Sequence, residues 1–353
     1  MTRRVSVVRF SFWGDGEMRK IRTIRVTSPS YDPWWNLALE EYLLDRVEAG
    51  TMILYLWQND RTVVIGRNQN AWRECRTELL EAEGGRLARR LSGGGAVYHD
   101  LGNCNFTFLA TSKTYDFLRQ IKVVLDALRS LGVAAEFGGR NDITVEGRKI
   151  SGNAFYRGAF GRFHHGTILV SVEMERMARY LQPSKAKLVA KGVTSVRSRV
   201  ANLCEFRPSV TAADVRDALQ RAFLEEFAFG DGEVLDASAL FAENAVKALR
   251  EKYASRSWVY GKTPAFDLEM EHRFDWGEVQ LGMTVKDGVV SECRFFTDAL
   301  DAERLRSIEC LFVGLVPEAK VFAERIGSAK TSCLAPEVRD VLGWLESQAL
   351  ELL

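Results

Sequence analysis

The sequence predicts an α+β fold with a large first domain and a second, smaller domain at the carboxy-terminal end. With 353 residues the chain exceeds the usual size of one domain. Strand-like and helix-like apolar patterns alternate along its first two thirds. Near Gly261-Lys262-Thr263-Pro264 the composition changes and a new alternating strand begins. We therefore expect a flexible extension over 1–20, a main domain over 21–258 and a small domain over 262–353.

Composition and charge are those of an ordinary globular protein. Hydrophobic residues make up 46%, charged residues 27%, and the net charge is +1, so we expect neither a nucleic-acid nor a membrane partner. No run approaches the roughly 20 apolar residues that span a bilayer. The six cysteines are widely spaced without a CxxC pair, which favours a reducing cytoplasm. Asp15 and Glu17 argue against a transit peptide, and Met18 is an alternative start.

The first elements form a helix and the beginning of a sheet. Asp32 as N-cap and Pro33 in the first turn open a predicted helix that runs to Ala49, with Gly50 as its stop. Two strands follow, and a third comes after a glycine-rich loop; they are predicted over 53–57, 62–66 and 105–108.

The later elements are predicted from periodicity and capping. A helical apolar stripe over 115–131 ends at Gly132, and a capping box formed by Thr211 and Asp214 opens another helix. Segments 142–145 and 149–154 flank a turn and indicate a hairpin. Alternation along this hairpin predicts that Lys149, Ser151 and Asn153 share one face. Alternating residues over 279–285 predict a strand of the small domain, and a helix behind Pro336 ends the chain.

The most informative stretch is the loop over 89–100, in which three glycines, Gly93, Gly94 and Gly95, follow two arginines. Glycine lacks a Cβ, so consecutive backbone amides can converge on one anion. Arginine adds donors that stay charged at ordinary pH. The loop therefore predicts a phosphate cradle, with a simple chain reversal as the alternative.

Three further segments, 139–142, 148–153 and 185–199, concentrate polar and basic side chains. Together with the glycine loop they outline an anion site, for which a solvated loop or a surface salt bridge is the alternative. Lys149 differs from the other lysines because a hairpin would hold its ammonium against the sheet, where it can neutralise developing charge.

Histidine and cysteine patterns suggest no metal or thiol chemistry. His164 and His165 are adjacent in a predicted strand and so point to opposite faces, and no ligand-spaced cysteine or acid accompanies them. Cys104 is best interpreted as a small buried residue. The glycine spacing also differs from the dinucleotide-binding fingerprint. We expect neither zinc nor NAD.

The ordered set of motifs resembles bacterial lipoate-protein ligase A, of the lipoyl/biotin protein ligase superfamily. The matching segments are SYDPWWNLA (30–38), TVVIGR (62–67), RRLSGGGAVYHDLGN (89–103), RND (140–142), RKISG (148–152), FHHGT (163–167) and KGVTSVRSR (191–199). The resemblance implies a large mixed-sheet catalytic domain of the biotin/lipoyl ligase type and a small α+β domain. Leu91 is a departure from the family pattern. The pair Cys104-Asn105 occupies a position at which the family varies.

The resemblance also implies an activity and its residues. Lipoate attacks the α-phosphorus of ATP to give lipoyl-AMP and pyrophosphate, and a lysine of an acceptor protein then takes the lipoyl group. Lys149 corresponds to the catalytic lysine that touches both lipoate and ATP, and Trp57 to an aromatic wall for lipoate. The implied ATP contacts are Arg90, Gly95, Ala96, Val97 and Tyr98, with Gly93, Gly94, Asp142, Lys191 and Arg197 as further phosphate or adenylate candidates. Mg²⁺ is implied as the metal ion, with Asp142 as its candidate partner.

Partners and alternatives follow from the same resemblance. The acceptors implied are lipoyl domains of 2-oxoacid dehydrogenase complexes and the glycine-cleavage H protein, and we expect a monomer. One alternative is a lipoyl or octanoyl transferase without its own activation step. Another is a non-catalytic lipoate-binding protein. The sequence does not distinguish lipoate from octanoate as the preferred acid.

Overall fold

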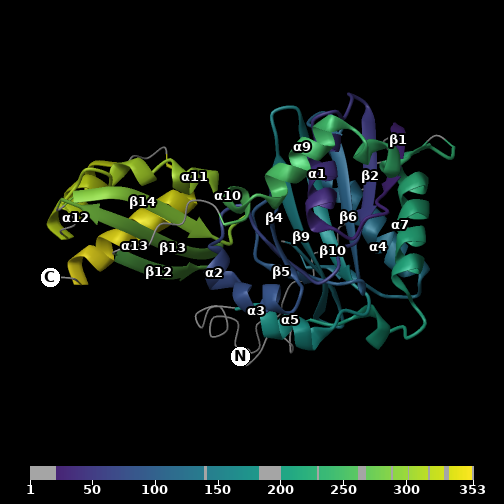
Figure 1. The fold of residues 1–353 in the computed structure, drawn as a ribbon, viewed down its shortest axis with the longest axis horizontal. Helices are drawn as coiled ribbons and strands as arrows, with labels where there is room; N and C mark the ends of the chain where they lie inside the picture. Colours follow the sequence, from purple (N-terminus) through teal and green to yellow (C-terminus); the bar gives the residue numbers. More distant parts are fainter. Residues whose placement is uncertain are drawn as a thin grey trace, which may run out of the picture.

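The computed structural model describes residues 21–138, 141–182, 200–228, 230–260, 268–287, 289–300, 302–316, 319–329 and 334–351. It confirms the predicted α+β fold, with a large mixed sheet in the main domain and a smaller carboxy-terminal domain (Figure 1). The extension predicted over 1–20, with Met18, lies outside the described residues. No helix in the described ranges is long and apolar enough to cross a bilayer.

The main sheet has eight strands, and its order explains where the site can form. Strands β11, β1 and β2 are parallel, and from β2 onward each neighbouring pair is antiparallel. In spatial order the strands are β11 (Glu233–Leu235), β1 (Arg22–Thr27), β2 (Thr51–Trp57), β6 (Asn103–Thr111), β10 (Gly161–Leu169), β9 (Arg148–Arg157), β8 (Asp142–Val145) and β7 (Glu136–Phe137). The predicted hairpin is thus confirmed as β8 and β9.

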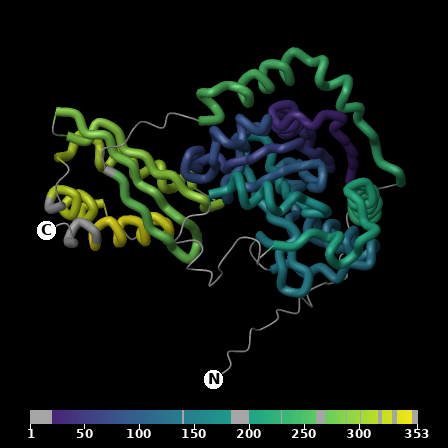
Figure 2. Tube along the Cα trace, turned by 60° about the horizontal axis from the view of Figure 1, so that its bottom comes forward, coloured from purple at the N-terminus to yellow at the C-terminus, as the bar shows by residue number. Residues whose placement is uncertain are grey.

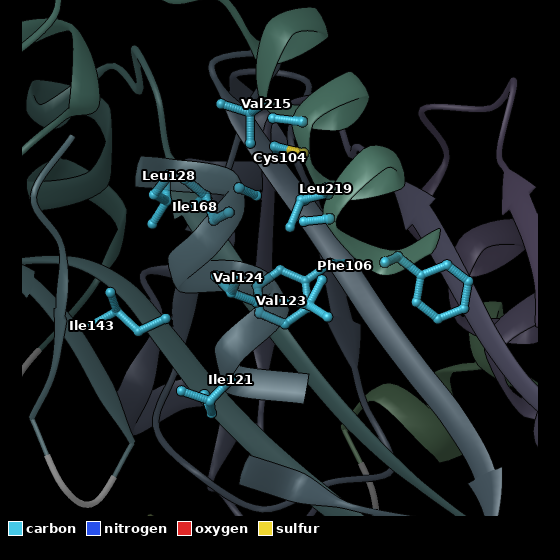
Figure 3. Close-up of a cluster of buried hydrophobic side chains, with 14 of the residues drawn as sticks. Cys104, Phe106, Ile121, Val123, Val124, Leu128, Ile143, Ile168, Val215 and Leu219 are labelled. Carbon is cyan, nitrogen blue, oxygen red and sulfur yellow. The ribbon is translucent and has the colours of Figure 1, made fainter. Parts of the chain in front are cut away.

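One face of this sheet is covered by α4 (Phe117–Ser130) and α7 (Ala212–Phe227). The apolar stripe of α4 packs against Phe106 and other strand residues, and α7 adds Val215 and Leu219 (Figure 3). The predicted capping box is present, since Asp214 N–H donates to Thr211 Oγ1 and Thr211 N–H to Asp214. The short helix η2 (Leu203–Glu205) leads into α7.

The opposite face is covered by α1 (Pro33–Leu44), α8 (Ala237–Phe241), α9 (Asn244–Ala254) and α10 (Arg256–Val259). In Figure 2 the green segment that carries α8 to α10 runs over the purple α1. Asp32 caps α1 as predicted. The predicted end at Ala49 is wrong, because the helix stops at Leu44. Val47 turns into the core, and Gly50, with φ of 77°, reverses the chain into β2.

A second, three-stranded sheet carries the glycine loop. Its order is β4 (Arg86–Arg89), β3 (Thr62–Ile65) and β5 (Val97–His99), and α2 (Ala71–Glu74), α3 (Thr77–Ala82) and α5 (Met174–Tyr180) lie around it. The glycine loop connects β4 to β5, which pair with opposite edges of β3. Both ends of the loop are therefore anchored in one sheet.

The small domain has a core of its own. Its antiparallel sheet consists of β12 (Leu268–Phe274), β13 (Gly277–Lys286) and β14 (Val289–Thr297). Helices α11 (Glu303–Arg306), η3 (Glu309–Leu311), α12 (Ala319–Ala329) and α13 (Pro336–Glu351) complete it. The alternation predicted around 279–285 is confirmed, since Val279, Leu281 and Met283 are buried in this core.

Candidate functional site

A row of directly paired residues crosses the main sheet and forms the floor of a cavity. Trp57 of β2 pairs with Asn105, Asn105 with Thr167, Thr167 with Gly152, and Gly152 with Asp142. All five line a cavity of about 590 Å³. Because neighbouring strands are 4.7–4.9 Å apart, the row spans about 14 Å from Trp57 to Gly152. The floor is therefore long enough for an extended small molecule.

A second row, two residues along the strands, joins the floor to helix α1. It contains Thr107 and His165, and both bind the buried carboxylate of Glu40. Thr107 Oγ1 donates to Glu40 Oε1 at 2.7 Å, and His165 Nδ1 lies 2.9 Å from the same oxygen. A carboxylate only accepts, so His165 Nδ1 is the donor in this contact. Trp57 Nε1 donates to Thr107 Oγ1 at 3.0 Å, which fixes the indole ring.

The same network reaches the glycine loop. His165 Nε2 lies 2.8 Å from Ser92 Oγ, and Arg90 Nε donates to that hydroxyl at 3.0 Å. Glu40, His165 and Ser92 are not among the site residues predicted from the sequence. A signal for Glu40 was present, since it is an acidic residue within the apolar stretch of α1. Its two partners are distant in sequence and come together only in the fold.

Lys149 reaches the cavity through an irregularity in the hairpin. Ser151 pairs with Ile143 and Lys149 with Thr144, so Ile150 is an extra residue in β9. This bulge shifts the alternation by one residue. Lys149 therefore lines the cavity together with Gly152 and Ala154.

The prediction that Lys149 shares a face with Ser151 and Asn153 is wrong. Ser151 is fully buried. The side chain of Asn153 binds His164 and the carbonyl of Asn141. The bulge at Ile150 is the physical reason, because it separates Lys149 from the alternation that the other two residues follow.

The Lys149 ammonium is paired and closely packed. Its Nζ lies 2.6 Å from Asp142 Oδ1, and both side chains are 29% exposed. Gly152 makes the room for it, because a Cβ at this position would lie 3.1 Å from Lys149 Nζ. The absence of a side chain at Gly152 thus sets the position of the charge.

We predict that Gly152→Ala lowers activity about tenfold with little change in melting temperature. The added methyl group displaces the flexible end of Lys149, and small misplacements of a reacting group are costly. Pyrophosphate release in the presence of lipoate, the activity that the family resemblance implies, and thermal unfolding measure the two effects. Gly343→Ala, at a helical position with open space around it, is the matched control. Unchanged pyrophosphate release in the Gly152 variant would contradict this role.

The glycine loop is packed against backbone on both sides. A Cβ at Gly66 would lie 2.2 Å from the carbonyl oxygen of Gly94, and Gly94 itself has φ of 86°. A Cβ at Gly93 would lie 2.4 Å from the carbonyl oxygen of Ala299 in the small domain. Any other residue at these positions would require the neighbouring backbone to shift.

Arg90 organises this loop from inside. It is 5% exposed, and its guanidinium donates to the carbonyls of Val64, Gly93 and Gly95. Burial lowers its pKa to about 10, so it stays charged at neutral pH. Because a trans peptide points its N–H opposite to its carbonyl, the N–H group of Ala96 points away from Arg90. The guanidinium thus orients an amide that an anion would need.

The small domain forms another wall of the cavity. Arg273, Asp298, Ala299 and Leu300 line it, and Gly94 N–H donates to the carbonyl of Ala299 at 3.2 Å. Thr297 N–H donates to the carbonyl of Asn68 at 2.9 Å. None of these residues is among the predicted site residues, because no local motif marks a contact between two domains.

The remaining predicted residues divide into three groups. Gly94, Gly95, Ala96, Val97 and Tyr98 line the cavity with Trp57 and Lys149, whereas Gly93 contacts the small domain. Lys191 and Arg197 lie outside the described residues.

Cys104 is fully buried in the apolar core, and burial raises its thiol pKa to about 12, which confirms its interpretation as a packing residue.

The two adjacent histidines have separate environments. His165 faces Glu40 and Ser92, whereas His164 stacks on Phe108 and Phe155. The prediction that they point to opposite faces is confirmed. Within the described ranges, no group of three or more His, Cys, Asp and Glu side chains is placed to hold a metal ion.

The structure is that of a two-domain α+β protein with a cavity for a small molecule. The mixed sheet, the glycine loop and the small domain form the walls of this cavity. Residues 32–224 match the family model of the lipoyl protein ligase A/B catalytic domain, and residues 263–344 match that of the bacterial lipoate protein ligase C-terminus. The first match covers more than half of the chain. The chain therefore belongs to the lipoate-protein ligase family, within the lipoyl/biotin ligase superfamily.

Solved structures of the same family are similar over most of their length. P. falciparum LipL1 in complex with lipoate is 28% identical with a TM-score of 0.74, over 93% of this chain and 99% of that one. A lipoate-protein ligase A bound with ATP is 27% identical with a TM-score of 0.57, over 69% and 100%. A bipartite lipoate protein ligase from Thermoplasma acidophilum, solved with its E2 lipoyl domain, is 28% identical with a TM-score of 0.58, over 71% and 100%.

Proposed function

We propose that this protein is an ATP-dependent lipoate-protein ligase. It activates lipoate to lipoyl-AMP with release of pyrophosphate, and then transfers the lipoyl group to a lysine of a lipoyl domain. The position of Lys149 carries the proposal. Its ammonium lies in one cavity with the ring of Trp57 and the glycine loop. The acyl acid and the phosphates can thus meet at a single positive charge.

The cavity floor suggests how the substrates lie. The acyl chain of lipoate runs along the row from Trp57, and its carboxylate ends near Lys149. The α-phosphate of ATP approaches the same ammonium, which offsets the repulsion between two anions and the charge that develops at phosphorus. Gly95, Ala96, Val97 and Tyr98 bind ATP through the loop that Arg90 holds in shape. Gly93, Gly94, Lys191 and Arg197 are further candidates for phosphate or adenylate.

Asp142 is the residue that we propose as a partner of Mg²⁺. Mg²⁺ prefers one or two carboxylates together with phosphate oxygens, and Asp142 presents one carboxylate beside Lys149. The metal ion supplies positive charge to the phosphates of bound ATP. Asp142 would then serve both the ion and the lysine.

Transfer through a thioester on Cys104 is not favoured by the environment of that residue. A nucleophilic thiol must ionise readily, whereas burial raises the thiol pKa of Cys104 to about 12. A protein that only binds lipoate would not need a lysine ammonium placed beside the glycine loop. The site therefore supports an enzyme that activates its own acid.

We propose lipoyl domains as the acceptors. The Thermoplasma structure with an E2 lipoyl domain supports this class of partner. By the resemblance, the particular acceptors are the lipoyl domains of 2-oxoacid dehydrogenase complexes and the glycine-cleavage H protein. We also propose a cytoplasmic monomer with its domains divided at 21–258 and 262–353.

One assay tests the proposed reaction and its partner together. The protein is incubated with lipoate, ATP, Mg²⁺ and a purified lipoyl domain, and the intact mass of the acceptor is measured. We expect a gain of one lipoyl group that requires ATP and is accompanied by pyrophosphate. Transfer from preformed lipoyl-AMP alone would favour a transferase without activation, and no mass gain on several lipoyl domains would contradict the proposal.

A further inference from the structure

Arg89 carries a buried charge that is surrounded by backbone carbonyls. It is 5% exposed, and a buried charge is costly unless hydrogen bonds replace its hydration. Five carbonyls from two segments supply that replacement. Nε donates to the carbonyls of Trp258 and Val259, and Nη1 donates to those of Gly66, Arg67 and Gln69, at 2.7–3.1 Å.

The Arg89 guanidinium stays charged in this environment. Burial, together with the positive charges of Arg67, Arg306 and Arg90, lowers its pKa to about 9, which is still above neutral pH. No carboxylate of the described residues is among the groups that shift this pKa. The carbonyl dipoles stabilise the charge, and the charge in turn fixes the carbonyls.

Residues 66–69 form a segment that we call the support loop. The carbonyl oxygens of Gly66, Arg67 and Gln69 all accept from one nitrogen atom of Arg89. Three carbonyl dipoles that point at one place repel one another, and the cation offsets this repulsion. The conformation of the support loop therefore depends on the Arg89 guanidinium.

One peptide group connects the support loop to the glycine loop. The Gly66 carbonyl binds Arg89 at 3.1 Å, and the N–H of the same peptide, at Arg67, donates to the Ser92 carbonyl at 2.8 Å. The two groups of a trans peptide point in opposite directions, so fixing the carbonyl directs the N–H at Ser92. Gly66 also packs directly on the carbonyl of Gly94. Arg89 thus acts on the glycine loop through this peptide.

The second segment that Arg89 binds is the end of α10. While Nε of Arg89 donates to the carbonyls of Trp258 and Val259, the indole Nε1 of Trp258 donates back to the Arg89 carbonyl at 2.9 Å. The Arg67 guanidinium lies 4.1 Å from the centroid of the same indole. Trp258 therefore stabilises both Arg89 and the support loop.

We propose that Arg89 is a positioning residue for ATP binding, which keeps the glycine loop in its anion-binding shape by fixing the support loop. This inference rests on the proposed function. Arg89 is not among the described residues that line the cavity, so it acts through the peptide between Gly66 and Arg67. A lysine at this position keeps the charge, but its single nitrogen atom cannot reach both segments that Nε and Nη1 bind.

The test separates positioning from general stability. Pyrophosphate release is measured with ATP and then lipoate as the varied substrate, in the wild type, Arg89→Lys and Trp258→Phe. Arg89→Lys should raise KM for ATP about tenfold and change KM for lipoate by less than about twofold. Trp258→Phe, which keeps an aromatic ring but lacks the indole N–H, should raise KM for ATP about threefold. If Arg89→Lys fails to fold, Trp258→Phe decides.

The matched control is Arg119→Lys. Arg119 is a largely buried arginine of α4, on the other face of the sheet, where it binds Glu226 at 2.5 Å. Its replacement should lower the melting temperature and leave KM for ATP unchanged. Folded Arg89 and Trp258 variants with the wild-type KM for ATP, or an equal rise in KM for both substrates, would overturn the positioning role.

Hydrogen exchange distinguishes failure of this inference from failure of the proposed function. In the protein without ligands, amides over 62–70 and 89–98 should exchange faster in Arg89→Lys than in the wild type, whereas those of α4 should exchange equally. If the wild type releases no pyrophosphate, the proposed function fails, and this exchange pattern still decides whether Arg89 fixes the two loops. Equal exchange of both segments in the two proteins would contradict the inference.

Discussion

Lys149→Ala is expected to reduce lipoate-dependent pyrophosphate release by at least about 10²- to 10³-fold, the range for loss of one well-placed charge-stabilising group. The ammonium lies in the cavity beside the glycine loop, 2.6 Å from Asp142. Its removal leaves two anions to meet without local compensation. The fold should be retained, because Lys149 is partly exposed and an ion pair of this kind contributes under about 1 kcal/mol.

Three measurements separate chemistry from stability in this variant. Pyrophosphate release reports activation, transfer from supplied lipoyl-AMP reports the second step, and thermal unfolding reports the fold. Arg148→Ala is the matched control, since Arg148 is the adjacent strand residue and pairs with Glu205 at 2.8 Å instead of facing the cavity. A folded Lys149 variant with near-normal activation would refute the assignment.

Local sequence patterns were sufficient to predict the helices and some of the residues of the candidate site. The cap at Asp32, the stripe of α4 and the capping box at Thr211 are short-range signals, and each predicted helix is present. Trp57 and Lys149 came from family motifs and both line the cavity. The end of the first helix was missed because Val47 packs into the core, which no local pattern encodes.

The other residues of the site could not be predicted, because they are brought together by contacts between segments that are distant in the sequence. Glu40, Ser92 and His165 lie on three different elements and meet only when α1 packs on the sheet. The bulge at Ile150 is set by the pairing of β8 with β9, and it reverses the face on which Lys149 lies. Alternation alone therefore predicted the wrong companions for Lys149.

Acidification from pH 7.5 to pH 5.5 is expected to lower the free energy of unfolding by about 3 kcal/mol through two buried histidines. Burial lowers the pKa of His99 to about 3, and lowers that of His164 well below its ordinary value of 6.5, with His165 adding to both shifts. The native protein holds these rings neutral, whereas the unfolded chain takes up a proton at each near pH 6.5. The unfolded state thus binds more protons below that pH, and stability falls as pH falls.

The two contributions can be separated with one substitution. His164 Nε2 donates to Asn153 Oδ1 at 2.8 Å, and His164→Gln keeps a donor there while removing the titrating ring. The variant starts from a lower stability because it loses the stacking on Phe108 and Phe155. Its loss between pH 7.5 and pH 5.5 should nevertheless be about half that of the wild type, since His99 alone then contributes about 1.4 kcal/mol. Urea unfolding at both pH values measures this, and an equal loss in both proteins would show that His164 does not resist protonation in the native state.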